Sequence, residues 1–533
     1  MNARTEQIAD VIANSLSVPD WPHPIWIVAR REGRRLGSAW VEPGPLWPQL
    51  TETLPTIGVD KATHLELAVF RYPRTVDPAT TKSFAKQTFG RVGYIFRLGD
   101  EETRIAPTEI IARNRAPQRM RDTFLSQHDL DPGGFRNRGA TLMYETSQAF
   151  LALGPEGATH AAHMFRGNEV FPVERIDAAE AQAMLDRMTG WAMVNQSPDG
   201  SLPYKYWPSR GETSSADNVI RQFLATLGLL RAAKLPGRAY LQPTARANLY
   251  RNLSKYVTDC GDYSALVCNG KAKLGAAALA GLAILEHEGD KGPLAETLNK
   301  IRLGIDRLWQ PDGAFRTFLW PEDRNDSQNF YPGEALLFYA RLYLQTREPA
   351  ILERCRLSFA TYRAWHRKQP NPAFIPWHTQ AYVHLYEATG DDEFRDFVFE
   401  MSDMIAKTQQ WGNPLPPDLW GRFFDPNWRG YGPPHASSTG VYMEGLAAAY
   451  RLARDTGDSE RAATYRLCLR RGLRNLRQLQ IASDIDAFYM ARRRAVIGAL
   501  RIEVYNNEIR LDNLGHALLA LTNLPSWDTV EAA

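Results

Sequence analysis

The sequence predicts a mainly α-helical protein in which six pairs of helices close into a ring, with a smaller α+β domain in front of it. Two patterns support this prediction. From Asp177 onward, a long amphipathic segment, a polar loop and a second segment rich in small apolar residues follow one another, and this unit recurs six times. Before Asp177, short stretches alternate apolar and polar residues with the period of a half-buried strand. We therefore expect an α+β domain at residues 1–175 and a helical ring at residues 176–533.

The N-terminal domain is expected to contain a mostly antiparallel sheet. Strand-like alternation occurs at residues 24–42, 64–70 and 90–107, with turn residues between these stretches. A helix is expected at residues 107–127, which begin with a proline in the first turn, or at residues 83–90. The stretch LDPGGFRNRG that follows is expected to be a loop.

The amphipathic segments of the ring carry charge on one face only and are predicted to be outer helices, whereas the small-residue segments are predicted to be buried inner helices. Asp-Gly and Gly-Asp turns between them supply tight turns and helix caps. The outer helices are expected at residues 177–194, 241–257, 293–309, 348–366, 391–409 and 458–479. The inner helices are expected to begin near Asn218, Gly270, Tyr331, Trp377, Thr439 and Leu511. Their first turns would then surround a funnel.

The helix pairs, the Pro-Asp-Gly turns at 198–200 and 311–313, and the Thr-Gly-Asp sequences at 389–391 and 456–458 resemble those of the α/α-toroid proteins, in particular the six-hairpin glycosidase-like group. The resemblance covers about residues 177–525 and implies an (α/α)6 toroid. It also implies one of several chemistries: glycoside hydrolysis, polysaccharide lysis, sugar epimerisation, terpene cyclisation or lanthionine formation.

Two of these chemistries lack residues that the resemblance would require. Lanthionine cyclases use a zinc site with two cysteines and a histidine beside one of them, whereas Asn269 follows Cys268 here and no second cysteine lies in a suitable loop. Terpene cyclases use an acidic DxDD sequence, and Asp484-Ile485-Asp486 is too short to replace it. We therefore expect carbohydrate chemistry that requires neither a metal nor another cofactor.

Composition argues against other classes of function. The formal net charge of +3 gives no basis for binding nucleic acid or an anionic membrane, and Arg492-Arg493-Arg494 is short enough to be a solvated helix face. With no secretory signal, no stretch of about 20 apolar residues and four scattered cysteines, a cytoplasmic protein without a membrane span is expected. Many of the 14 Trp and 21 Tyr lie in loops, where they either stack on sugar rings or fill the top of the ring.

The polar residues at the beginnings of the inner helices form the candidate site, because a closed ring would bring them to one funnel. The carboxyl and imidazole groups among them are expected to be catalytic: Glu334, Glu444, Asp512, His435 and His516. The remaining residues are expected to bind substrate: Asn218, Arg221, Tyr331, Trp377, His378, Tyr442 and Arg510.

Several of these residues also have a structural interpretation. Glu334 could serve the N-terminus of its helix, where a carboxylate is favourable. Asp512 lies one turn before His516 and could pair with it or with Arg510, fastening the last helix to the first. Glu444 lies well inside its helix, where a carboxylate is costly unless it is paired or functional.

Sugar cleavage needs one protonated and one ionised carboxyl group. An epimerase or lyase needs a base, often Tyr or His, and a cation for a uronate carboxylate. The first hypothesis is therefore a glycoside-hydrolase-like enzyme that acts on a saccharide in the funnel, and the second is a sugar epimerase or uronate lyase. The third is a non-catalytic glycan-binding or scaffold protein, in which the N-terminal domain, whose role the sequence leaves open, binds a protein partner.

Overall fold

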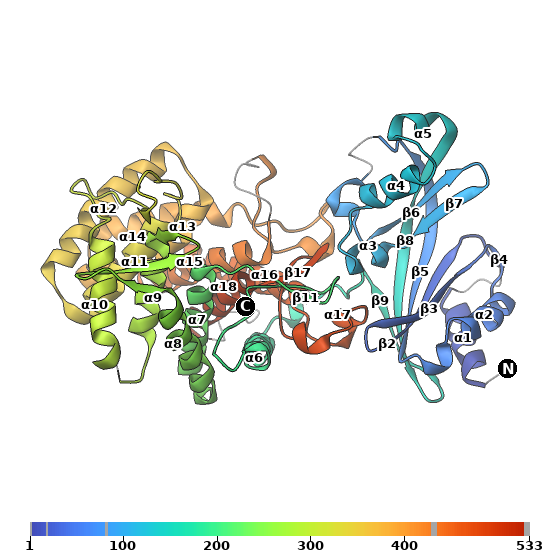
Figure 1. The fold of residues 1–533 in the computed structure, drawn as a ribbon, viewed down its shortest axis with the longest axis horizontal. Helices are drawn as coiled ribbons and strands as arrows, with labels where there is room; N and C mark the ends of the chain where they lie inside the picture. Colours follow the sequence, from blue (N-terminus) through green and yellow to red (C-terminus); the bar gives the residue numbers. More distant parts are fainter. Residues whose placement is uncertain (1–2, 17–19, 80–83, 291, 428–433, 527–533) are drawn as a thin grey trace.

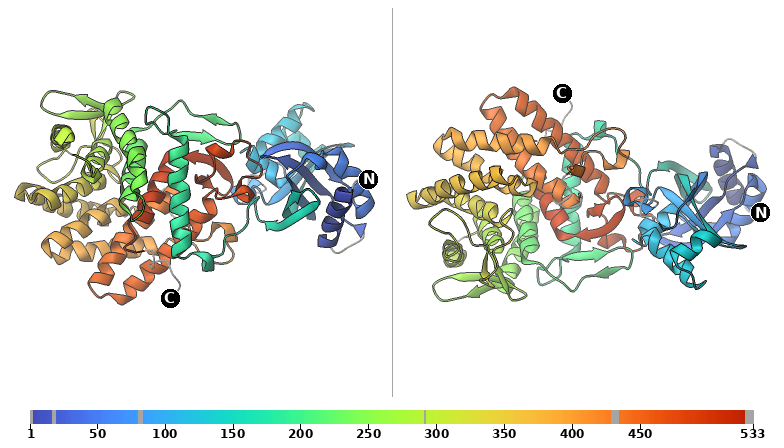
Figure 2. Two further views of the ribbon diagram at one scale, coloured as in Figure 1. Left: turned by 90° about the horizontal axis from the view of Figure 1, so that it is seen from below. Right: turned by 90° about the horizontal axis from the view of Figure 1, so that it is seen from above.

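The computed structural model describes residues 3–16, 20–79, 84–290, 292–427 and 434–526. An α+β part and a helical ring lie side by side along the long axis of the molecule (Figure 1), and the two further views in Figure 2 place the α+β part at one end. The large sheet of the first part ends with β9 (Gly157–Met164), and the ring begins with α6 (Ala178–Asn195).

A seven-stranded antiparallel sheet forms the centre of the N-terminal part. The long strand β8 pairs with β5 along one edge, and with β6 and then β9 along the other. The strands are β2 (Ile25–Arg31), β3 (Arg34–Val41), β5 (His64–Val76), β6 (Val92–Leu98), β7 (Glu101–Ile105), β8 (Gly139–Gly154) and β9, in the order β3-β2-β5-β8-β6-β7 with β9 beside β8. The predicted antiparallel sheet is confirmed, although β8 and β9 were not foreseen.

Two helices that the sequence patterns did not reveal, α1 (Ala3–Leu16) and α2 (Leu46–Thr56), pack against each other near the β3 end of the sheet. Their apolar side chains share one buried cluster with residues of β2 and β5. A two-residue ribbon of β1 (Asp20–Trp21) and β4 (Gly44–Pro45) lies beside them.

The helix expected at 107–127 is present as two shorter helices, α3 (Pro107–Ala112) and α4 (Pro117–Ser126). Pro117 explains the break, because proline disfavours the helical conformation of the residue before it. The alternative stretch at 83–90 has 3-10 turns, one of them at Lys86–Thr88, but no α-helix among its described residues. LDPGGFRNRG, expected to be a loop, contains α5 (Pro132–Arg138), which Asp131 caps by accepting a hydrogen bond from the Gly134 amide at 2.6 Å.

The predicted (α/α)6 toroid is confirmed. The inner helices pack against one another in chain order, and the last closes the ring by packing against the first. They are α7 (Val219–Lys234), α9 (Leu274–Glu286), α11 (Tyr331–Thr346), α13 (Ile375–Thr389), α15 (Ala436–Asp455) and α18 (Leu511–Thr522). The outer helices are α6, α8 (Gln242–Tyr256), α10 (Gly292–Asp306), α12 (Pro349–Lys368), α14 (Asp392–Ala406) and α16 (Ser459–Leu479).

Burial follows the sequence pattern. Helix α9, which is apolar on nearly every face, is buried at every position. Helices α8, α10, α12, α14 and α16 pack against the inner helix that precedes each of them, and α6 packs against α18 and the 3-10 turn at Arg493–Ala495. No helix within the described residues is both long enough and apolar enough to cross a bilayer.

Two small sheets lead into the inner helices and fix where those helices begin. One contains β10 (Lys205–Trp207), β11 (Glu212–Thr213), β16 (Arg501–Glu503) and β17 (Asn506–Arg510), and the other contains β12 (Val257–Asp259), β13 (Ser264–Cys268), β14 (Lys271–Lys273) and β15 (Phe318–Trp320). Strand β14 runs directly into α9, and β17 runs directly into α18. The last residues of these strands, Lys273 and Arg510, are therefore held rigidly at the mouth of the ring.

The two parts of the chain are joined by buried polar contacts. Arg166, just after β9, lies 2.6 Å from Asp418 in the ring through its Nε, and both side chains are almost fully buried. Arg166 also donates to the carbonyl of Gln87 in the N-terminal part at 2.8 Å. Farther along, Asn507 donates to the Ile111 carbonyl at 2.6 Å. These contacts fasten the α+β part to the ring.

Candidate functional site

A cavity of about 360 Å³ lies where the inner helices begin. Every inner helix, or the residue just before it, contributes to its wall. The lining residues are Asn218, Ile220, Arg221, Leu224, Lys273, Leu279, Ser327, Phe330, Tyr331, Glu334, Ala373, Trp377, His435, Ser437, Ser438, Val441, Tyr442, Arg510, Asp512 and His516. Of the twelve residues predicted from the sequence to form a site, all but His378 and Glu444 line this cavity.

Glu334 stands in the first turn of α11 and is 4% exposed. Its Oε2 atom has no hydrogen-bond partner among the described residues. Burial raises the pKa of Glu334 to about 8; Lys273 opposes this shift and the Glu444 carboxylate adds to it. The side chain fits because α9 has Gly275 opposite it, where a Cβ atom would collide with the carboxyl group. Glu334 is therefore a protonated carboxyl group at neutral pH.

His516 and Glu444 form a hydrogen-bonded pair at the wall of the cavity. Nδ1 of His516 lies 2.7 Å from Oε1 of Glu444, whose side chain is fully buried. Burial raises the pKa of Glu444, and the neighbouring His516 opposes that shift. Helices α15 and α18 pack closely enough for the two side chains to meet, because α15 has Gly440 at the position where a Cβ atom would collide with His516. With Nδ1 engaged by Glu444, Nε2 is the ring nitrogen left to face a ligand.

Asp512 is held between two guanidinium groups. Its carboxylate lies 2.9 Å from Nε of Arg221 and 3.0 Å from Nε of Arg510. Burial acts to raise the pKa of Asp512, but the two arginines outweigh it and hold the pKa at about 2. Asp512 is therefore ionised and neutralised, and it orients two cationic groups at the cavity.

His435 caps the N-terminus of α15. Its Nδ1 atom accepts a hydrogen bond from the Ser438 amide at 3.0 Å, and the Ser437 hydroxyl lies 2.8 Å from the same nitrogen. Burial lowers the pKa of His435 to about 4, although Asp512 opposes the shift. A nitrogen that accepts an amide N–H carries no proton, so the proton of the neutral ring is on Nε2. The His435 ring is thus a neutral hydrogen-bond donor.

His378 was predicted to bind substrate, but the structure places it in the core. It is fully buried, stacks on Phe374 with ring centroids 3.5 Å apart, and its Nδ1 donates to the Phe374 carbonyl at 2.8 Å. Burial lowers its pKa to about 3. The neighbouring Trp377 does line the cavity. Proximity in sequence misled the prediction, because successive residues of a helix face different directions.

Lys273 lines the cavity and was not among the predicted site residues. Lys273 is the last residue of β14 and directly precedes α9, whereas Lys271, two residues earlier on the strand, does not line the cavity. Burial lowers the pKa of Lys273, and Lys271 and Arg221 add to this shift. Its position directly before an inner helix was the feature that could have identified it.

Comparisons with solved structures find similarity at the level of the fold. A family 76 glycoside hydrolase from a bovine Bacteroides thetaiotaomicron strain is 9% identical, with a TM-score of 0.48 over 86% of this chain and 95% of that chain. Cellobiose 2-epimerase from Bacillus thermoamylovorans is 12% identical, with a TM-score of 0.47 over 64% and 98%. An unsaturated glucuronyl hydrolase specific for heparin is 15% identical, with a TM-score of 0.45 over 65% and 96%.

No protein-family model matches the chain, and no curated protein matches it by sequence. At these identities the likeness to solved structures concerns architecture and not chemistry. What the structure itself shows is a closed ring of six helix pairs, an (α/α)6 toroid.

Proposed function

We propose that the cavity is the active site of a carbohydrate-active enzyme in which His516 takes a proton from the bound saccharide. The observation that carries this proposal is the 2.7 Å contact between Nδ1 of His516 and the buried Glu444 carboxylate. Such a carboxylate orients the ring, keeps the first proton on Nδ1 and stabilises the imidazolium that forms when Nε2 accepts a second. Burying a carboxylate costs free energy, and the contact with His516 supplies a functional reason for Glu444 to be buried.

The lining of the cavity suits a sugar. Trp377, Tyr331 and Tyr442 offer aromatic surface to the apolar faces of a sugar ring. Arg221 and Arg510, which Asp512 orients, offer donors for hydroxyl groups or for a carboxylate. The volume of about 360 Å³ falls within the range of small-molecule sites.

Proton transfer at carbon is the reaction class that these residues fit best, as in a sugar epimerase or a uronate lyase. His516 removes the proton from the carbon beside a carbonyl or carboxylate group, and the electron pair moves onto the oxygen of that group. The neutral N–H of His435 and the nearby arginines are suited to stabilise the negative charge that develops there. Return of a proton to carbon, with Glu334 as the candidate donor, gives an isomer, whereas loss of a neighbouring substituent gives an unsaturated product.

Glycoside hydrolysis is the second candidate, and the raised pKa of Glu334 favours it. A carboxyl group with a pKa of about 8 is protonated at neutral pH and can donate to a departing sugar oxygen. The second carboxylate of such a mechanism would be Asp512, but two arginines bind it and lower its basicity. Hydrolysis here would therefore need His516 as the base that activates water.

A non-catalytic glycan-binding ring is the remaining alternative. A scaffold would be expected to neutralise its buried carboxyl groups with cations or to cap them with backbone groups. Asp512 is neutralised in this way, but Oε2 of Glu334 has no partner in the described part of the chain. An unpaired, protonated carboxyl group at a cavity supports catalysis over passive binding.

The test is product analysis on a panel of reducing sugars, uronates and their oligomers, with wild type, His516→Asn and the surface variant Asn299→Ala. Asn299 is exposed on α10, outside the cavity. The proposal is supported if Asn299→Ala converts a sugar at the wild-type rate and His516→Asn converts it about 10²-fold or more slowly. Conversion that persists in folded His516→Asn would contradict it.

A further inference from the structure

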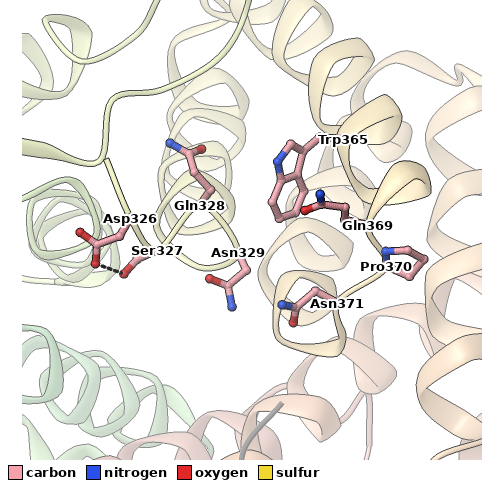
Figure 3. A pocket seen from close by; sticks show the side chains of 8 residues that line it. All are labelled: Asp326, Ser327, Gln328, Asn329, Trp365, Gln369, Pro370 and Asn371. Carbon is pink, nitrogen blue, oxygen red and sulfur yellow. Dashed lines mark hydrogen bonds between the residues drawn. The ribbon is translucent and has the colours of Figure 1, made fainter. Parts of the chain in front are cut away.

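A second cavity, of about 540 Å³, opens beside the funnel between the loop before α11 and the end of α12 (Figure 3). We refer to it as the side groove. Trp365 lies in the last turn of α12, Gln369 is the C-cap residue directly after that helix, and Asn371 begins the turn that leads into α13. The lining residues are Asp326, Ser327, Gln328, Asn329, Trp365, Gln369, Pro370 and Asn371.

The side groove adjoins the funnel along two segments of chain. Ser327 lines both cavities. On the opposite wall, Asn371 lines the side groove and Ala373, two residues later, lines the funnel. The two cavities are therefore neighbours, with Ser327 in the wall of both.

Four polar side chains of the side groove have hydrogen-bonding groups with no partner among the described residues. Within the described residues, the side chains of Asn329 and Gln369 and the indole N–H of Trp365 make no hydrogen bond, and Asn371 uses only its Oδ1 atom, which accepts from the Ala373 amide at 2.9 Å. Gln328 differs, because the Phe315 carbonyl and the Tyr362 hydroxyl engage both ends of its amide. Figure 3 shows the unengaged groups on opposite walls of the same space.

The chemistry of the side groove differs from that of the funnel. Asp326 is the charged residue among those that line it, and Arg324 pairs with that carboxylate at 2.8 Å. The other polar groups are one half-buried indole, one hydroxyl and four primary amides, of which the protein engages only that of Gln328 at both ends. An aromatic face next to neutral groups that both donate and accept hydrogen bonds matches the apolar face and the hydroxyl rim of a neutral sugar ring.

We propose that the side groove binds further sugar units of an oligosaccharide whose reacting unit occupies the funnel. Exposed amides are commonly satisfied by water, but here they surround a cavity that adjoins a candidate active site and contains a tryptophan. The substrate class would then be an oligosaccharide or polysaccharide chain and not a free monosaccharide. This inference rests on the proposed function.

The experiment measures binding by calorimetry to cello-, manno-, xylo- and galacturono-oligosaccharides of one to six units, with Glu334→Gln as the background to suppress turnover. The test variant adds Asn329→Ala and Gln369→Ala, which remove unpartnered amides from half-exposed or exposed positions and should not affect folding. A second variant adds Trp365→Phe, which keeps an aromatic ring against Phe374. Asn299→Ala on α10 is the matched control.

The inference predicts tighter binding of longer oligomers and a loss of about fivefold or more for them in the amide variant, with binding of one unit unchanged. Trp365→Phe should also reduce the increase in affinity that comes with a longer oligomer. If affinity does not increase with oligomer length, or if both variants keep the full increase, the inference is overturned and the proposed function is not. Failure of every sugar to bind the background protein and wild type would overturn both the inference and the proposed function.

Discussion

Nδ1 of His516, on the last inner helix, lies 2.7 Å from Oε1 of Glu444, which is 0% exposed on the neighbouring inner helix. The pair joins two helices through residues that are 72 positions apart in sequence. It gives one imidazole at the cavity a fixed orientation and a carboxylate that stabilises its protonated form. In the proposed function this makes His516 the proton acceptor.

Glu444→Gln should lower kcat by about 10²- to 10⁴-fold while the protein remains folded. The amide can donate to Nδ1, which would then carry no proton, so Nε2 would carry it and could no longer act as a base. The measurement is kcat for wild type and variant on a substrate identified from the panel, with near-ultraviolet circular dichroism as the check on folding. Unchanged turnover in the folded variant would exclude this role for Glu444.

Glu334→Gln should make the stability of the protein less sensitive to a rise in pH between about 4.5 and 8. The pKa of Glu334 is about 8 in the folded protein and about 4.5 in the unfolded chain, so wild type loses stability as pH rises from about 4.5 to 8, by up to about 5 kcal/mol. Glutamine does not titrate. As pH rises across this range, the free energy of unfolding of the variant should therefore increase relative to that of wild type. A difference that does not depend on pH would show that Glu334 is ionised in the folded protein.

Asp512→Asn should destabilise the protein by about 2 kcal/mol at pH 7, because Arg221 and Arg510 lose their ionised partner. The pKa of Asp512 lies below its usual value, so this contribution is present above about pH 4 and is lost as pH falls toward 2. Urea unfolding at several pH values measures it. Asp455→Asn, in an exposed pair with Arg454, is the control and should change little. Equal effects at both positions would argue against a special role for the buried cluster.

Arg166→Met should cost roughly 3–5 kcal/mol, because it leaves the buried Asp418 carboxylate without its partner. The double variant Arg166→Met/Asp418→Leu should recover much of that loss, since it removes both charges. Unfolding followed by intrinsic fluorescence would also show whether the single variant separates the α+β part from the ring as two transitions. If the double variant is no more stable than the single one, the contact does not act as a paired charge.

Much of the fold could be predicted from the sequence because hydrophobic periodicity is a local property. The sequence placed the first residues of two inner helices, Tyr331 and Leu511, where the structure has them. It did not identify α1, α2 or the long strand β8. Buried and less buried positions do not alternate strictly along β8, so the period-2 signal of that strand is weak. Closure of the ring followed from the number of helix pairs, so the funnel could be predicted as well.

The chemistry of the site could be predicted only in part. Asp512 was correctly considered as a partner of Arg510, since the two are close in sequence, but its contact with Arg221 joins the first and last inner helices and depends on ring closure. The Glu444–His516 pair and the burial of His378 likewise depend on which face of each helix points inward. The spacing of these residues in the sequence limits which side chains can meet, but it does not determine which contacts form.

The central claim, that His516 exchanges protons with carbon of a saccharide in the funnel, is tested most directly by proton nuclear magnetic resonance in D2O. The panel of reducing sugars and uronates would be incubated with wild type, His516→Asn and Asn299→Ala. The account predicts that deuterium from the solvent replaces a carbon-bound hydrogen beside the carbonyl or carboxylate of one sugar class, with wild type and Asn299→Ala but not with His516→Asn. No exchange with any sugar, or exchange that folded His516→Asn retains, would contradict it.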